Sequence, residues 1–359
     1  MVDGRSKNFF ETMTPSPIPL VVINYPDLLD ETSDISGDIL NAFGADGLGV
    51  LAIRNVPDWE ILVGKTLPIA HKLVNLPEST LKSLEHSDSM FNSGWSFGKE
   101  KLGEKPDMNK ASYYFNPLSD DPRPETRELY PWALPANRWP GAELPEFEKM
   151  CKKLGSVMHG VTVHVARRID KMGLGASIAE EMELSLKAKG RMLYYFPVED
   201  ETDWIGWHND SGFLTALTPD MYFEHCSGKQ VDNPEPDKAG LWVAARNGEL
   251  QRVDIPRDCL AVQCGECMQI LTGGRLVATP HSVRPPSKNS QGISRATLPV
   301  FVDVSPDFVL SSPLGREAVF AHNAVKERVP PLSERWNEGD SFADFLGASF
   351  RAYYQWSLK

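Results

Sequence analysis

The chain has 359 residues, of which 41% are hydrophobic and 24% charged, a composition typical of a globular protein with a sizeable core. Its formal net charge is −12, and no segment gathers Lys and Arg into a block, which argues against nucleic acid and anionic membranes as partners. Residues 1–14 lack the apolar core of a signal peptide, and the sequence has no run of about 18 apolar residues that could cross a bilayer, so we expect a soluble cytoplasmic protein. The five cysteines are an odd number, which argues against a disulfide framework.

Residues 1–140 are predicted to form an N-terminal α/β region. Short apolar runs at Pro19–Ile23 and Leu48–Ile53 predict strands, and an amphipathic pattern at Trp59–Val74 predicts helix. From residue 88 to 140 the chain is rich in Gly, Pro, Asn, Ser and aromatic residues. This composition disfavours a long helix or a regular ladder and predicts long ordered loops.

Residues 141–189 are predicted to form supporting helices. The segment from Leu144 to Met172 has helical periodicity and ends at Gly173 and Gly175, which suit a helix C-cap. We therefore expect one long helix ahead of the next region.

Residues 190–310 are predicted to form a β-barrel or jelly roll, because short apolar segments alternate with turn residues. These segments read RMLYYF, FLTAL, GLWVAA, CLAVQC, QILT, RLVAT and ATLPVFV. The pair Gly273-Gly274 predicts a tight hairpin between QILT and RLVAT that delivers the chain to His281. In the C-terminal segment, residues 311–359, apolar residues near helical spacing behind Ser341 predict a closing helix over residues 341–356.

His208 and Asp210 lie two residues apart, so on a strand both side chains would point to the same face. Two histidines and one carboxylate can hold an iron(II) ion on one side and leave three positions open for other ligands. His281 qualifies as the second histidine, because antiparallel strands of one barrel can bring distant positions together. An H-x-D pair by itself is weak evidence for a metal site, since it occurs often by chance.

Arg295 strengthens this interpretation, because it follows His281 by 14 residues on a predicted strand and shares a strand face with Thr297. A guanidinium presents a fork of donors that matches a carboxylate, and a hydroxyl can add a further hydrogen bond. The sequence thus predicts a metal centre with an anion-binding group beside it.

With these residues the chain resembles the isopenicillin N synthase-like family of iron(II)/2-oxoglutarate dioxygenases, whose pattern is H-x-D, a distant H, and R-x-S. The resemblance covers most of residues 18 to 310 and implies a mainly β fold: a double-stranded β-helix, or jelly roll, with helices on its outside. It also implies that Tyr195 in LYYFP lies near the cosubstrate, with Tyr194 a weaker candidate. The chain departs from the family with Leu193 in place of an Asn, Thr297 in place of the usual Ser, and a polar insertion at residues 226–238.

The resemblance implies that iron(II), 2-oxoglutarate and dioxygen are required, that Arg295 and Thr297 bind the far carboxylate of 2-oxoglutarate, and that succinate and CO2 are released. Hydroxylation or desaturation of a small organic substrate would result. Trp95, Tyr113 and Phe223 are candidate substrate contacts because they are large residues in loop-rich or site-adjacent segments, with core packing as the competing role.

Two other functions stay open at this level. The first is an oxidase of the same fold that does not consume 2-oxoglutarate and uses R-x-S to bind the carboxylate of its own substrate. The second is a jelly-roll binding protein without catalysis, because a fold does not fix a function. The Cys264-Gly-Glu-Cys267 segment has the spacing of a redox pair or half a zinc site, but we interpret these residues as buried thiols because no second pair follows.

Overall fold

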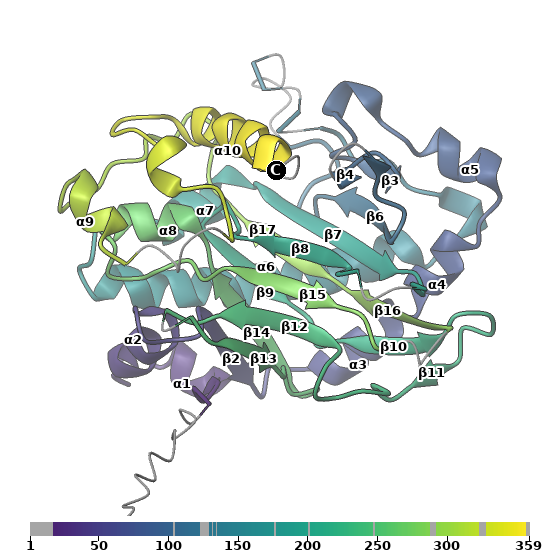
Figure 1. Cartoon of the computed structure of the whole chain (residues 1–359), viewed down its shortest axis with the longest axis horizontal. Coiled ribbons are helices and arrows are strands. Elements are labelled where there is room, and N and C mark those ends of the chain that lie inside the picture. Colours follow the sequence, from purple (N-terminus) through teal and green to yellow (C-terminus); the bar gives the residue numbers. More distant parts are fainter. Residues whose placement is uncertain are drawn as a thin grey trace, which may run out of the picture.

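Two β-sheets pack face to face in the computed structural model, which describes residues 17–102, 105–122, 129–130, 132–133, 135–175, 177–199, 202–246, 248–287, 292–322 and 328–356 (Figure 1). The larger sheet has eleven strands and the smaller has four. Apolar residues from both sheets, among them Leu193 and Tyr195 of the larger and Val243 and Val283 of the smaller, share one buried cluster. This arrangement confirms the predicted jelly roll.

The larger sheet combines strands from the N-terminal region with strands from the predicted barrel. Along its main path the order is β1 (Val21–Asn24), β2 (Val50–Arg54), β14 (Cys259–Cys264), β9 (Leu214–Leu217), β17 (Pro299–Val302), β7 (Ala188–Tyr195), β16 (Ile293–Thr297), β10 (Met221–Glu224) and β11 (Gln230–Val231). Two further strands extend it from β7: β6 (Lys110–Phe115) and then β3 (Gly94–Phe97). The parallel pair β1–β2 confirms the two short strands predicted at the N-terminus.

The smaller sheet carries the strands that lead to the metal-ligand candidates. Its order is β13 (Leu250–Val253), β12 (Gly240–Ala244), β15 (His281–Arg284) and β8 (Ile205–His208). A separate two-stranded ribbon joins β4 (Lys101–Leu102) and β5 (Lys105–Pro106). Because β8 and β15 are neighbours, residues distant in the sequence meet at one end of this sheet.

Helices cover the outer face of the larger sheet and close one end of the molecule (Figure 1). They are α1 (Tyr25–Leu29), α2 (Ser36–Phe43), α3 (Trp59–Thr66), α4 (Ile69–Val74), α5 (Glu78–Ser83), α6 (Phe147–Lys171), α7 (Ala179–Ser185), α8 (Glu266–Leu271), α9 (Arg316–Phe320) and α10 (Phe342–Trp356), with 3-10 turns at Ser87–Ser89, Gly141–Glu143 and Leu332–Glu334. No helix in the described ranges is long and apolar enough to cross a membrane.

Two helix predictions are confirmed together with their ends. Helix α6 is followed by Gly173 at φ +63°, a left-handed conformation that favours glycine. At α10 the backbone N–H of Asp344 donates to Oγ of Ser341 at 3.1 Å, which is the predicted N-cap. Phe342 and Phe345 are fully buried, so α10 packs its apolar face on the core as expected.

The prediction that residues 88–140 form loops without a regular ladder was wrong in part. Strand β6 pairs with β7 over six residues and with β3 over four, and all six of its side chains are buried. Its sequence KASYYF carries the β-favouring aromatic residues that the surrounding Gly and Pro obscured.

The predicted hairpin at Gly273-Gly274 was also wrong. The segment QILT lies in and just after helix α8, and the residues that follow it form a turn and an extended segment outside any strand. Both glycines do have positive φ, +61° and +77°, but they end a helix: the N–H of Gly274 donates to the carbonyl of Gln269 at 2.8 Å. A buried apolar run of this length fits either a strand or a short helix, and periodicity alone does not separate them.

Candidate metal and cosubstrate site

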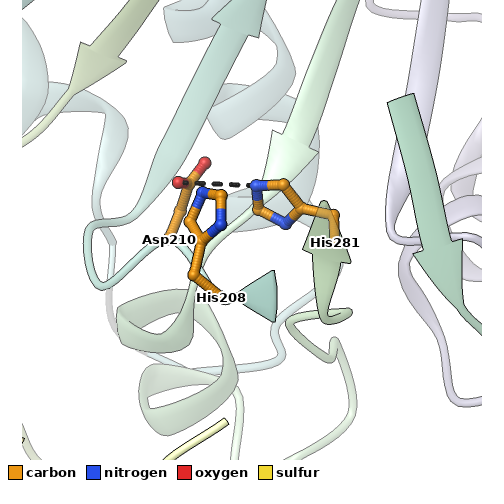
Figure 2. A group of neighbouring side chains, drawn as sticks. All are labelled: His208, Asp210 and His281. Atoms are coloured by element: carbon orange, nitrogen blue, oxygen red, sulfur yellow. Dashed lines mark ion pairs between the residues drawn. The ribbon is translucent and has the colours of Figure 1, made fainter. Parts of the chain in front are cut away.

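The three candidate metal ligands converge at one end of the smaller sheet (Figure 2). His208 ends β8 and His281 begins β15, and the two residues are paired in the ladder. Asp210 follows in the loop that leaves β8, and Figure 2 shows the three side chains pointing toward one another. Their ligand atoms lie within 4.8 Å of one another, and Oδ1 of Asp210 is 3.9 Å from Nε2 of His281. The residues therefore offer two imidazole nitrogens and one carboxylate oxygen to a single ion, the donor set of non-haem iron(II).

Hydrogen bonds behind the imidazoles leave their Nε2 atoms free for a metal. Nδ1 of His208 donates to the carbonyl of Gly206 at 2.8 Å, and Nδ1 of His281 lies 3.2 Å from the carbonyl of Thr279 and 2.6 Å from the amide of Gln263. A proton on Nδ1 fixes the tautomer whose Nε2 lone pair can bind an ion. Burial, and then the neighbouring His281, lower the pKa of His208, which keeps its ring in the neutral, metal-binding form near pH 7.

The carboxylate of Asp210 is oriented by a strand of the opposite sheet. Oγ1 of Thr215 in β9 donates to Oδ2 of Asp210 at 2.6 Å, which leaves Oδ1 turned toward His281. Both side chains are buried. A hydrogen bond of this kind to a ligand fixes the ligand's direction and raises the affinity for the ion. Local sequence patterns carry no separate signal for Thr215, because its role depends on the contact between the two sheets.

Helix α8 holds the loop that follows β8 and contains Asp210. Backbone N–H groups at the start of α8 donate to carbonyls of this loop: Glu266 to Asp210 at 2.8 Å and Cys267 to Gly212 at 3.0 Å. The approach is so close that a Cβ on Gly265 would lie 2.2 Å from the carbonyl oxygen of Gly212. The helix that replaces the expected hairpin thus positions a metal ligand.

The two cysteines of the CGEC segment are packing residues at this junction. Cys264 and Cys267 are buried and unpaired, and Sγ of Cys267 donates to the carbonyl of Ser211 at 3.2 Å. Burial raises the pKa of the Cys264 thiol to about 12, so it carries no thiolate at neutral pH. The interpretation as buried thiols is confirmed.

The C-terminal helix α10 also fixes this loop. The backbone N–H of Asn209 donates to Oη of Tyr353 at 2.8 Å, and its side-chain amide donates to Glu266 at 2.9 Å. Glu266 is itself held by Arg335, both side chains being 1% exposed. The buried ion pair of Glu266 and Arg335 therefore connects α8 and the C-terminal segment to Asn209, which lies between His208 and Asp210.

An inner cavity extends from the metal ligands between the two sheets to Arg295. Arg295 is 4% exposed, its Nη2 is bonded to Asp220, and its guanidinium carbon lies 4.7 Å from the ring centroid of Tyr195. Burial acts against its charge, but Asp220 and then Tyr195 raise the pKa of Arg295 above its ordinary value. The guanidinium is therefore a permanent cation deep in the cavity.

Two donors of Arg295 have no partner among the described residues. Nε and Nη1 are buried and make no hydrogen bond to this part of the chain, and Thr297, one side chain along the same strand face, lines the same cavity. A buried unpaired donor costs free energy unless a ligand accepts from it. A carboxylate oxygen can accept a charge-assisted hydrogen bond from such a donor, so the residues present fit the far carboxylate of 2-oxoglutarate.

The structure separates the two tyrosine candidates. Tyr195 lines the inner cavity and pairs with Arg295 in the sheet, whereas Oη of Tyr194 on the opposite face donates to Oγ of Ser294 at 2.7 Å. Asp220, the carboxylate that orients Arg295, was missed from the sequence. Its position just before β10 carries no recognisable motif.

A larger outer cavity of about 1130 Å³ opens beyond the metal ligands. His208 and Asp210 lie in the walls of both cavities, so the candidate metal site is where the two meet. The three residues considered for substrate contact lie in neither wall. Trp95, Tyr113 and Phe223 are buried, with Tyr113 packed edge-on to Phe147 at 4.9 Å between ring centroids, which is the competing core role.

Residues 190–304 match the family model described as the 2OG-Fe(II) oxygenase superfamily. These residues therefore form a 2OG-Fe(II) oxygenase domain. The protein is a 2-oxoglutarate-dependent dioxygenase, whose cofactors are iron(II), 2-oxoglutarate and dioxygen. The matched residues include all three candidate ligands and Arg295, which ties the family assignment to the cluster seen in Figure 2.

Curated relatives of this oxygenase are distant. Scopoletin 8-hydroxylase of Arabidopsis thaliana is 26% identical over 137 residues, which are 37% of this chain and about a third (33%) of that protein. The UPF0676 protein C1494.01 of Schizosaccharomyces pombe is 25% identical over 301 residues, covering 79% of this chain and 81% of the relative.

Solved structures share the fold over nearly the whole oxygenase. A 2OG-Fe(II) oxygenase family protein of Caulobacter crescentus has a TM-score of 0.65 at 19% identity and covers 92% of this chain and 98% of its own. A full-length Neurospora crassa protein, solved in complex with alpha-KG and 5-formyluracil, has a TM-score of 0.65 at 18% identity over 91% of this chain and 94% of its own. These similarities confirm the architecture and carry no information on this chain's substrate.

Proposed function

We propose that this oxygenase hydroxylates a small organic molecule, with His208, Asp210 and His281 as the iron ligands. Arg295, Thr297 and Tyr195 would bind 2-oxoglutarate, and succinate and CO2 would be released. The observation that carries the proposal is the convergence of the three ligands at one end of a cavity whose other end holds a buried guanidinium with two free donors. Desaturation of the substrate is the alternative outcome of the same chemistry.

When bound, iron(II) with 2-oxoglutarate and dioxygen supplies the oxidising power, and the protein supplies binding, orientation and exclusion of water. Thr215 and the carbonyls behind the imidazoles would keep the ligand atoms directed at the ion. Arg295 would pair with the far carboxylate of the cosubstrate, and the ring of Tyr195 would cover one face of the guanidinium. Apolar walls between the sheets, such as Leu241 and Val283, would keep water from this end of the cavity.

The regions around the matched domain would select the substrate. The outer cavity is lined on one side by residues of the N-terminal region, such as Tyr114 and Trp132, and on another by Leu346 and Phe350 of α10. Residues 190–310 would thus carry the chemistry, while residues 1–140 and 311–359 would shape the substrate site. The buried, unpaired cysteines fit a reducing compartment, and we place the enzyme in the cytoplasm on that ground.

An anaerobic titration tests the proposed ligands and cosubstrate. Adding iron(II) and then 2-oxoglutarate to the protein should produce the weak visible charge-transfer band of the chelate, and His281→Ala should abolish it. A protein that binds iron(II) but gives no band with 2-oxoglutarate would contradict the cosubstrate assignment. During turnover, succinate release separates this function from an oxidase of the same fold that uses Arg295 for its own substrate.

A further inference from the structure

Strand β7 presents a row of functional side chains to the cavities. Lys189, Arg191, Leu193 and Tyr195 alternate along the strand and therefore share one face. Tyr195 and Leu193 line the inner cavity, Arg191 lines both cavities, and Lys189 lines the outer one. Lys189 thus lies one side chain beyond Arg191 on the substrate side, about 7 Å along the strand.

The cations of this wall differ in their counter-ions. Arg191 is paired with Glu100, and Nζ of Lys187 lies 3.3 Å from Oδ2 of Asp303. Among the residues that the structure describes, no carboxylate lies within ion-pair distance of Lys189, and no hydrogen-bond acceptor meets its ammonium. Lys189 is therefore the cation of this group that lacks a carboxylate partner among the described residues.

Aromatic rings flank the Lys189 ammonium. Nζ lies 5.5 Å from the ring centroid of Phe301, its cross-strand neighbour, and 5.7 Å from that of Tyr114. Phe301 lies in the walls of both cavities, which places this ammonium beside the entrance to the metal site. Burial, and then Lys187, lower the pKa of Lys189 to about 8 against the opposing effect of Asp303. An anion bound here would relieve that unfavourable burial of charge.

Part of the outer cavity rim is apolar. Leu129 and Phe350 are 73% and 48% exposed, and Trp132 lies edge-on to Phe350 at 6.3 Å between ring centroids. Exposed apolar side chains around a cavity are typical of a site that receives an apolar ligand. The cavity therefore combines apolar side chains at part of its rim with the Lys189 ammonium, which has no carboxylate within ion-pair distance among the described residues.

We propose that Lys189 binds a carboxylate of the prime substrate, so that the enzyme acts on small organic acids with an apolar body. The carboxylate would accept from the Lys189 ammonium between Tyr114 and Phe301, and the apolar body would pack against the rim. The far carboxylate of 2-oxoglutarate has its own partner in Arg295, at the other end of the inner cavity. This inference rests on the proposed function, which supplies the reason for a substrate in the outer cavity.

Binding measurements on matched acids and amides test the inference. The full chain, loaded with Mn(II) and 2-oxoglutarate, is titrated with phenylacetate, cinnamate and 2-naphthoate and with the primary amide of each, and tryptophan fluorescence reports binding. At least one acid should bind the wild type about 10- to 100-fold more tightly than its amide, as expected for a charge-assisted hydrogen bond. Lys189→Met should remove this preference, and Lys189→Arg should restore part of it.

Lys149→Met is the matched control, because it removes an exposed lysine of α6 that lines neither cavity. It should keep the full preference for the acid. The inference is overturned if no acid in the panel is preferred over its amide, or if Lys189→Met keeps the preference. The 2-oxoglutarate affinity, measured on the same samples, distinguishes failure of the proposed function from failure of this inference. If the wild type does not bind 2-oxoglutarate, the proposed function is refuted. If it binds 2-oxoglutarate but does not prefer any acid, only the role of Lys189 is refuted.

Discussion

Replacing Arg295 with leucine tests the cosubstrate site at its most informative residue. The side chain is buried, and its Nε and Nη1 have no acceptor among the described residues. If one of them donates to the far carboxylate of 2-oxoglutarate, the variant loses a charge-assisted hydrogen bond together with the positive charge. At the high end of about 3 kcal/mol for such a bond, Kd rises about 150-fold.

Arg295→Lys should have a smaller effect than the leucine variant. Its ammonium keeps the positive charge and can still pair with Asp220, but it lacks the planar set of donors with which a guanidinium can bind Asp220 and a second acceptor. We expect a loss of about 10-fold, close to the value of one bond. This variant also controls for the Asp220 carboxylate, which the leucine variant leaves without its arginine.

The assay is calorimetric titration of 2-oxoglutarate into Mn(II)-loaded protein without oxygen. Arg257→Leu is the matched control, because it removes an arginine from an Arg–Asp pair that is exposed on the surface. Its Kd should equal that of the wild type, and all variants should keep their Mn(II) affinity. A Kd for Arg295→Leu within threefold of the wild type would refute the assignment of Arg295.

Four further predictions concern the metal site. His281→Ala should abolish iron(II) binding, measured by titrating the metal into the protein with and without 2-oxoglutarate. An iron(II) affinity equal to that of the wild type would show that His281 is not a ligand. Thr215→Val should weaken iron(II) binding about 10- to 100-fold, the usual effect of losing a hydrogen bond to a metal ligand, with an unchanged circular dichroism spectrum. Tyr353→Phe should lower the free energy of unfolding by about 1 kcal/mol, because the part-buried N–H of Asn209 loses its acceptor; thermal denaturation that matches the wild type would contradict this role. Because the folded-state pKa of His208 lies below its unfolded value, the unfolded chain gains the proton first as pH falls, so metal-free protein should lose stability below about pH 6.5; a melting temperature that rises from pH 7.5 to pH 5.5 would be the opposite result.

Local patterns in the sequence were sufficient for much of the fold. The strand segments of β7, β9, β12 and β14 and the two main helices were predicted, because each buries one face of a regular element and so repeats apolar residues at the period of that element. The prediction that Ser341 caps α10 and Gly173 ends α6 rests on backbone requirements of the same local kind. The pattern H-x-D, H and R-x-T, taken with the family resemblance, also predicted which residues lie together around the inner cavity.

Only the tertiary structure decided how these pieces are held. Helix α8 takes the place of a predicted hairpin because its start bonds the loop of Asp210, a contact between segments more than 50 residues apart. Thr215 orients that ligand across the gap between two sheets, and Lys189 stands apart from Arg191 and Lys187 only by what lies near its ammonium. Sequence patterns record the repeat of an element along the chain, whereas the partner of a side chain depends on which elements meet in space.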